Sequence, residues 1–360
     1  MTQRERQVLQ LIEKNPLISQ QQIADALGIT RSSAAVHISN LSRKGLIAGR
    51  GYVLRSGSYA VVVGGVNVDI GGRSFEPLVA ADSNPGKVTV SLGGVGRNIA
   101  HNLSLLGTDV RFLTAYGEDN YGAQVAASCS ELGIDISHAL RTSEAPTSTY
   151  LYLADNLGEM ALAVSDMSVC ERITPAYLAA QLPLLQNAQV VVADTNIPKE
   201  SLEFLAQNCS APLFIDPVST AKAEKIRGIL HGIHTLKPNA LEAALLTGVE
   251  INGPEDAKKA AGRLLKMGVH RVFISMGGNG VCAAMADECI ILPPIQGNRI
   301  NTTGCGDAFM AAIVWAYLEG MDLENTALAG LAAGSVAMEY PETINPALCA
   351  VAVKKRMEQR

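Results

Sequence analysis

Residues 301–307 read NTTGCGD, and an apolar run follows them to Leu318. In this stretch Gly304 and Gly306 flank a small residue, so backbone N–H groups can crowd around an anion. A helix through the apolar run would direct the positive end of its dipole at the same point. Asp307 stands within this anion site, where it is suited to take a proton from a hydroxyl that attacks a phosphate. An ordinary helix N-cap is the alternative, because Gly-Asp before an apolar run is common capping chemistry.

Six other short motifs occur in order along the chain. They are GGVNVD at 64–69, GGVGRNIA at 93–100, GEDNYG at 117–122, DP at 216–217, KPNALE at 237–242 and SMGGNG at 275–280. Together with NTTGCGD, which is similar to the signature D-T-x-G-A-G-D, the series resembles the ribokinase-like (PfkB) carbohydrate and nucleoside kinases over residues 59 to about 345. The resemblance implies an α/β fold, a ribokinase-like three-layer sandwich with a mainly parallel central sheet and a small β lid.

The resemblance also implies roles for individual residues. Asp307 would be the catalytic base, with the backbone at Gly304, Cys305 and Gly306 as a cradle for phosphate. ATP would be the phosphoryl donor, and Mg²⁺ with its waters would be organised by Asn239 and Glu242. The acceptor would bind at Asn67, Asp69, Gly93, Gly94 and Asn98, and the nucleotide at Asn239, Ser275, Gly277, Gly280 and Gly330.

Plainer roles fit several of these residues. Asn239 is a suitable helix N-cap after a proline, which is compatible with organising a metal. Gly93 and Gly94 would also suit a tight turn, and the buried Asp69 could satisfy backbone donors alone. The chain contains neither GxxxxGK[ST] nor a complete GxGxxG, so a P-loop or Rossmann dinucleotide site is not favoured.

Two positions depart from the family signature. Asn301 stands where the signature has Asp, which puts in doubt the monovalent-cation (K⁺) loop that this Asp helps to build in some members. Cys305 replaces Ala; its backbone N–H is unchanged, but a thiol there could make the activity sensitive to oxidation.

Several segments resemble the pseudouridine kinase branch of this family. They are residues 81–87, Arg97 within the second glycine motif, and residues 165–167, 193–196 and 216–219. A uracil joined through carbon has an extra N–H, and Asp166 or Asn84 in the lid could accept it. We therefore expect phosphorylation of the 5′-hydroxyl of pseudouridine. Another nucleoside or a sugar such as ribose or fructose is the first alternative, and a transcription regulator with a kinase-like sensor domain is the second.

Composition and charge limit the class of protein. The chain has 360 residues and a net charge of -5, but residues 1–55 carry eight basic and three acidic side chains, whereas the remainder carries 21 and 31. Residues 1–55 are basic and the remainder of the chain is acidic. If one of the two parts binds nucleic acid, this charge distribution indicates that it is the short basic segment. The sequence shows neither an apolar stretch of about 18 residues nor a signal-peptide pattern, which favours a cytoplasmic protein with no membrane association. Seven scattered cysteines without a C-x-x-C pair indicate reduced thiols.

Residues 1–55 have the pattern of a winged helix-turn-helix domain. Apolar spacing predicts helices at about 3–13, 19–27 and 30–43, and residues 46–54 alternate around glycines as a small hairpin would. On the third helix, the candidate DNA-binding residues are Arg31, Ser32, Ser33 and His37. A three-helix module for docking or dimerisation that never touches DNA is the alternative. Residues 56–58 would be a flexible linker.

From Tyr59 to the C-terminus, at 59–360, short apolar strands alternate with helical stretches, which predicts one kinase domain with a mainly parallel sheet. Two stretches, about 71–92 and 147–165, break this alternation and are expected to form hairpins. In the family these positions form a β lid that covers the substrate and often pairs subunits, so the resemblance implies a homodimer through the lid.

Overall fold

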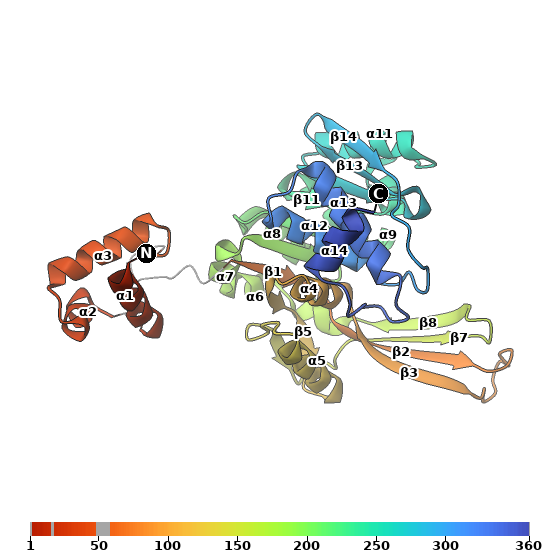
Figure 1. Cartoon of the computed structure of the whole chain (residues 1–360). Helices are drawn as coiled ribbons and strands as arrows, with labels where there is room; N and C mark the ends of the chain where they lie inside the picture. Colours follow the sequence, from red (N-terminus) through yellow and green to blue (C-terminus); the bar gives the residue numbers. More distant parts are fainter. Residues whose placement is uncertain (1, 16–17, 48–57, 360) are drawn as a thin grey trace. The chain divides into compact units, whose positions relative to one another are not determined.

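The computed structural model describes residues 2–15, 18–47 and 58–359 and divides the chain into two compact units, 1–58 and 59–360 (Figure 1). The hairpin predicted at 46–54 and the linker predicted at 56–58 lie almost entirely outside the described residues. None of the helices in the described part is long and apolar enough to cross a membrane.

The first unit contains the three helices that the sequence predicts. They are α1 (Gln3–Lys14), α2 (Gln20–Leu27) and α3 (Arg31–Arg43). Thr30 caps α3 by accepting a hydrogen bond from the backbone N–H of Ser33 at 3.2 Å, and Gly28 ends α2 in the left-handed conformation. The core of the unit consists of Val8, Ile12, Ile23, Ala24, Ala34, Ile38, Leu41 and Ile47. Buried Glu5 pairs with Lys44 at 2.7 Å, which ties the start of α1 to the end of α3.

The second unit is built on an eight-stranded sheet with the order β14-β13-β12-β11-β10-β9-β1-β4. Its strands are β1 (Tyr59–Val63), β4 (Asp109–Leu113), β9 (Val190–Asp194), β10 (Leu213–Asp216), β11 (Thr235–Leu236), β12 (Arg271–Ser275), β13 (Val281–Met285) and β14 (Glu288–Leu292). The six strands from β4 to β12 in this order run parallel to one another. Strand β13 pairs antiparallel with both β12 and β14. The predicted mainly parallel sheet is confirmed.

Helices cover both faces of this sheet because its strands are apolar on both sides. One face packs against α4 (Val95–Leu105), α5 (Asn120–Glu131), α12 (Cys305–Leu318), α13 (Leu323–Ala337) and α14 (Ala350–Met357). The other face packs against a 3₁₀ segment (Ser168–Arg172), α6 (Pro175–Ala180), α7 (Leu182–Asn187), α8 (Lys199–Asn208), α9 (Thr220–Ala223), a second 3₁₀ segment (Glu224–Gly232), α10 (Ala240–Thr247) and α11 (Pro254–Lys266). The three predicted layers are present.

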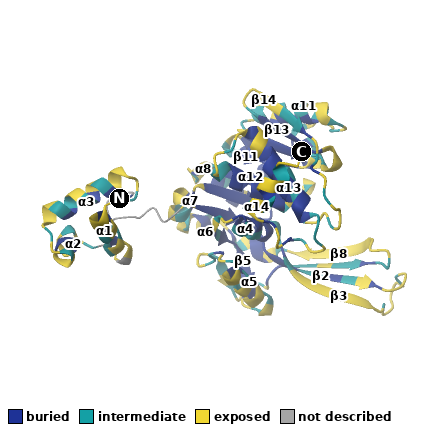
Figure 2. Ribbon diagram, in the orientation of Figure 1, coloured by how far each residue is buried: buried dark blue, intermediate teal, exposed yellow. Residues whose placement is uncertain are grey.

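A second sheet forms the lid, with the strand order β3-β2-β7-β8. Its strands are β2 (Asn67–Ser74), β3 (Gly86–Gly93), β7 (Thr149–Ala154) and β8 (Met160–Asp166). The antiparallel pairs β2–β3 and β7–β8 are the two hairpins expected at about 71–92 and 147–165. The lid extends away from the body of the kinase unit, and much of its surface is exposed (Figures 1 and 2). A two-stranded sheet of β5 (Ala115–Gly117) and β6 (Leu140–Thr142) lies beside α5, and a short 3₁₀ turn spans Gly277–Asn279.

Candidate active site

The amino end of α12 is built so that its first backbone amides stay free of side-chain caps. Gly304 occupies the N-cap position with φ +83°, and no side chain caps the helix. A Cβ at this position would overlap the carbonyl oxygen of Thr343, so only glycine fits the turn. Asp307 lies in the first helical turn rather than at the N-cap. The capping alternative for Asp307 is therefore wrong, and the end of the helix is suited to an anion.

Asp307 is held by one side-chain hydrogen bond. Its Oδ2 accepts from Asn98 Nδ2 at 2.9 Å, which joins α12 to α4. Burial, with the nearby charge of Asp216, raises the pKa of Asp307 to about 7, and the Asn98 bond and Lys237 only partly oppose this. The residue as a whole is half-buried. A carboxylate with this pKa is well matched to general-base work near neutral pH.

A buried ion pair lies next to this carboxyl group. Lys237 Nζ is 2.8 Å from Asp216 Oδ2 and donates to the carbonyl oxygen of Gly306 at 3.2 Å. Burial lowers the pKa of Lys237, but Asp216 and other carboxylates, including Asp307, more than offset it and raise the pKa above its usual value. The ammonium group is therefore a fixed positive charge beside the start of α12.

No role for Lys237 or Asp216 was predicted from the sequence, although both belong to the motifs quoted above. Asp216 is the last residue of β10, and Lys237 directly follows β11, its parallel neighbour. Because ligands gather at the carboxyl ends of parallel strands, a charged residue at each of two adjacent strand ends was the signal that could have found the pair.

Asp194 at the end of β9 organises the glycine motifs. Its Oδ2 accepts from the N–H groups of Gly65 at 3.0 Å and Gly96 at 2.7 Å, and the residue is fully buried. Gly94 has φ +98°, and a Cβ there would lie 2.6 Å from the carbonyl oxygen of Gly65. The two glycine segments are thus locked together, which sets the start of α4 and the position of Asn98.

The predicted acceptor residues meet at this place. Asn67 Nδ2 donates to Asp69 Oδ1 at 2.6 Å, and the Asp69 carboxylate lies against Gly93, where a Cβ would overlap it. Burial raises the pKa of Asp69, while Asn67 and the Arg97 charge counteract it. Asn98 follows on α4, so Asn67, Asp69, Gly93, Gly94, Asn98 and Asp307 form one connected site.

The two lid residues proposed to bind the base lie in different parts of the lid. Asp166 pairs with Thr149, the partner of Val68, so it projects from the face of the lid opposite to Asp69. Its Oδ1 accepts from the Ser168 N–H at 3.0 Å. The amide oxygen of Asn84 accepts from the Val79 N–H at 2.8 Å and closes the β2–β3 loop. Asp166 thus lies on the other lid face from Asp69, and Asn84 lies in the β2–β3 loop; contact of either side chain with a base stays a prediction.

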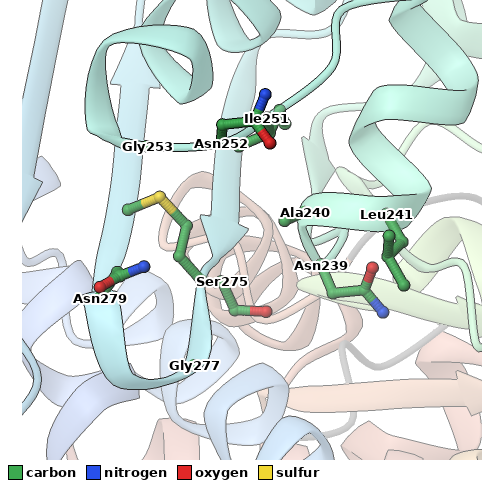
Figure 3. Close-up of a pocket in the computed structure, with 10 residues that line it drawn as sticks. Asn239, Ala240, Leu241, Ile251, Asn252, Gly253, Ser275, Gly277 and Asn279 are labelled. Atoms are coloured by element: carbon green, nitrogen blue, oxygen red, sulfur yellow. The ribbon is translucent and has the colours of Figure 1, made fainter.

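Three of the five expected nucleotide residues line a pocket of about 260 Å³ (Figure 3). Asn239, Ser275 and Gly277 line it together with Ala240, Leu241, Ile251, Asn252, Gly253, Met276 and Asn279. Gly280 is buried behind the Gly277–Asn279 turn, with φ +81°. Gly330 is buried in α13, where a Cβ would lie 2.6 Å from the Phe309 ring. Gly330 therefore packs α13 against α12, and this contact does not support its expected place in the wall of a nucleotide pocket.

The candidate metal residues form a helix cap. The Asn239 N–H donates to Glu242 Oε2 at 2.8 Å, and the Glu242 N–H donates to Asn239 Oδ1 at 2.9 Å. Burial raises the pKa of Glu242. The cap uses one carboxylate oxygen and leaves the other, which fits a hydrated cation held through water. In the described part of the chain, no three Asp, Glu, His or Cys side chains cluster closely enough to bind a metal by themselves.

The predicted DNA-binding residues share the amino half of α3. Arg31 and Ser32 are exposed, whereas Ser33 and His37 are half-buried. Ser33 Oγ lies 2.9 Å from Thr30 Oγ1 within the cap. Val36 on the same helix is also exposed. Arg31 and Ser32 are the two of the four that are exposed, and Ser32 Oγ also lies 2.9 Å from Thr30 Oγ1.

Comparison with known proteins agrees with these observations. Residues 58–348 match the model of the pfkB family carbohydrate kinases, and residues 1–48 match a winged helix-turn-helix DNA-binding model. The chain is 41% identical to a pseudouridine kinase of Escherichia coli over 82% of this chain and 95% of the relative. It is 38% identical to an uncharacterized sugar kinase of the same organism, YeiI, over 97% of both chains. A carbohydrate kinase from Agrobacterium tumefaciens has a similar structure, with a TM-score of 0.75 and 27% identity over 84% of this chain and 98% of that one.

Proposed function

Because the chain belongs to the pfkB family of carbohydrate kinases and is a phosphotransferase with an alcohol acceptor, we propose that it phosphorylates the 5′-hydroxyl of pseudouridine with ATP. The observation that carries the chemistry is the position of Asp307, partly exposed at the uncapped start of α12 and bonded to Asn98. The sequence is 41% identical to a pseudouridine kinase over 95% of that relative, which supports pseudouridine as the acceptor.

In this proposal the sugar hydroxyls bind at Asn67, Asp69 and Asn98, which directs the 5′-hydroxyl at Asp307. Asp307 accepts the hydroxyl proton as the oxygen bonds to the γ-phosphorus of ATP, while the bond from that phosphorus to the bridging oxygen breaks and ADP leaves. The amides at the start of α12 and the Lys237 ammonium, held by Asp216, stabilise the charge on the phosphoryl oxygens. All of these groups are in place before a substrate arrives, so little reorganisation is required.

The nucleotide would bind in the pocket beside Asn239, Ser275 and Gly277. Mg²⁺ would be held through water near Glu242, and when bound it neutralises phosphate charge. A K⁺ ion near the 301–307 loop stays an open part of the proposal. Asn301 in this loop donates to the carbonyl oxygen of Pro341 at 2.9 Å and accepts from the Thr303 N–H, so it orders the loop without a charge.

The test is product analysis with the full-length protein, ATP and Mg²⁺. Pseudouridine should gain one phosphate by mass, and ³¹P–¹H correlation should place it on the 5′ carbon. Uridine, ribose and fructose are assayed beside it. If pseudouridine gives no product while another acceptor is phosphorylated, the proposal of pseudouridine as acceptor is wrong and that other compound takes its place. The other acceptors are included because one relative is an uncharacterized sugar kinase.

We propose a second function for the N-terminal unit, the binding of duplex DNA. The family match over residues 1–48 and the exposed Arg31 and Ser32 at the start of α3 support it. Helix α3 would enter the major groove with its amino end, and basic side chains would contact phosphates. The combination indicates a cytoplasmic kinase that also regulates transcription.

We further propose a homodimer formed through the lid. One lid face exposes only apolar side chains at its centre, namely Val88, Val90, Leu151, Leu162 and Val164, which are 49–70% exposed. A contiguous apolar face of this kind is unfavourable in water and favours association. Sedimentation velocity should show a dimer, and Val90→Lys should shift it toward the monomer; a wild-type monomer at micromolar concentration would contradict this proposal.

A further inference from the structure

Two tyrosine side chains lie next to each other on strand β7 of the lid. Tyr150 and Tyr152 are separated by one residue, so both project from the same face of the sheet. Their ring centroids are 5.9 Å apart, and the ring planes are tilted by 35°. Both residues are half-buried. The pair therefore forms an aromatic surface that remains partly open.

Strand register places this aromatic surface on the acceptor side of the lid. Tyr150 is the direct partner of Asp69 in the parallel pairing of β7 with β2, and Tyr152 is the partner of Gly71. Paired residues project from the same face, so the Tyr150 side chain stands beside the Asp69 carboxylate. Asp69 in turn adjoins the start of α4, the helix that carries Asn98.

Neighbouring residues set the positions of the two rings. A Cβ at Gly71 would overlap the Tyr152 ring, so this glycine gives the ring its space over β2. The Tyr150 hydroxyl contacts Met160 Sδ at 3.5 Å. A ring that is already positioned loses little side-chain freedom when a ligand stacks on it.

The opposite face of the same sheet has different chemistry. Leu151, between the two tyrosines, projects there beside Val90 and Val164 and is half-exposed. Apolar side chains occupy the centre of that side, which suits a second subunit. The face with Asp69 and the tyrosines combines a carboxylate with aromatic rings, which suits a ligand that has both hydroxyl groups and a planar ring.

We propose that Tyr150 and Tyr152 form the surface on which the planar base of a nucleoside acceptor stacks, and that they favour nucleosides over free sugars. This inference rests on the proposed function, since it needs the acceptor sugar at Asp69 and its 5′-hydroxyl at Asp307. Every base has a π face, so stacking recognises a nucleoside without deciding which base it carries. The tyrosines thus select the class of acceptor.

The test compares Tyr150→Ala and Tyr152→Ala with the wild-type full-length protein on pseudouridine, uridine and ribose. Both variants should lose roughly ten- to hundredfold in kcat/KM for the two nucleosides and less than about threefold for ribose. Tyr152→Phe should recover most of the loss relative to Tyr152→Ala, because the ring rather than the hydroxyl makes the contact. Calorimetric titration of the same three ligands provides a readout independent of turnover.

Leu151→Ala is the matched control, because it shortens a side chain on the same strand but on the opposite face. It should change nucleoside and ribose binding by the same factor. The inference is overturned if the tyrosine variants lose kcat/KM for the nucleosides and for ribose by the same factor. It is also overturned if they keep wild-type nucleoside affinity with an unchanged melting temperature. A wild-type protein that uses ribose but neither nucleoside would instead refute the proposed function, and this result is visible before any variant is made.

Discussion

The environment of Asp307 suits a carboxyl group that changes its protonation state near neutral pH. Burial and the neighbouring Asp216 disfavour its charge, while Asn98 and Lys237 keep the charged form accessible. This balance depends on groups that come from four separate parts of the chain, α12, α4 and the ends of β10 and β11. Because side chains far apart in sequence set this pKa, it could not be read from the NTTGCGD motif.

Asp307→Asn should keep the shape of the site and lose its base. We expect kcat to fall by roughly 10²–10⁴, because an amide cannot accept the proton of the hydroxyl. ATP affinity should persist or tighten slightly, since a negative charge leaves an anion site. Steady-state kinetics and nucleotide titration on this variant check the prediction, and a kcat close to wild type would remove Asp307 from the role of base.

The pKa of about 7 also predicts opposite pH trends for activity and stability. The wild-type kcat/KM should rise through about pH 7 as the carboxyl group loses its proton. Between the ordinary pKa of 3.8 and about 7, the folded state binds more protons than the unfolded state, so the contribution of Asp307 to the free energy of unfolding falls as pH rises. Asp307→Asn should therefore be the more stable protein at about pH 8, with the difference vanishing near pH 4. Thermal melts across this range check the sign; a difference that does not vary with pH would contradict it.

At the scale of elements, the start of α12 depends on the turn at Gly304. Gly304→Ala forces a Cβ into a left-handed position against Thr343 and should lower the free energy of unfolding by at least about 1–2 kcal/mol. Turnover should fall as well, because the amides move. Gly278→Ala is a suitable control: Gly278 lies in the Gly277–Asn279 turn, its φ is not positive, and no atom lies within 4 Å of an added Cβ. Equal melting temperatures for the two variants would show that the Gly304 turn is not required.

Helix α3 carries a separate prediction about DNA. Arg31→Ala should weaken duplex binding, and binding should fall steeply with salt because phosphate contacts release counterions. Arg6→Ala is the charge-matched control, since Arg6 is exposed on α1 rather than on α3. Fluorescence anisotropy with genomic fragments selected by the full-length protein provides the measurement. An absence of DNA binding at low salt, or equal losses in both variants, would favour the docking-module alternative.

The sequence predicted elements better than it predicted contacts between them. Periodicity located the three N-terminal helices and the parallel strands, because each depends on local spacing of apolar residues. The two lid hairpins were expected from turn residues, and the family resemblance implied that they form a lid. The lid face on which Asp166 lies depends on strand register, set by its pairing with Thr149, and apolar spacing does not reveal that register. The sequence prediction placed Gly330 in a pocket although the residue packs against Phe309, and it gave no role to the Lys237–Asp216 pair; both depend on tertiary contacts.

At the scale of the whole molecule, the chain joins a basic helical unit to an acidic kinase unit. The relative that matches over 97% of both chains extends across both units, whereas the pseudouridine kinase matches over 82% of this chain. We infer that the kinase unit contains the complete active site, since every group assigned to phosphoryl transfer lies between Asn67 and Asp307. The N-terminal unit would then determine where the protein binds, and it would take no part in phosphoryl transfer.

The most direct test of the central claim is the ratio of kcat/KM for pseudouridine to that for uridine under saturating ATP and Mg²⁺. Uridine lacks the extra base N–H of pseudouridine, so any acceptor that the site provides for this N–H is left unpaired with uridine, which costs more than about 1.4 kcal/mol. We therefore predict a ratio of at least about ten. Equal or greater kcat/KM for uridine, ribose or fructose in the same panel would contradict the assignment.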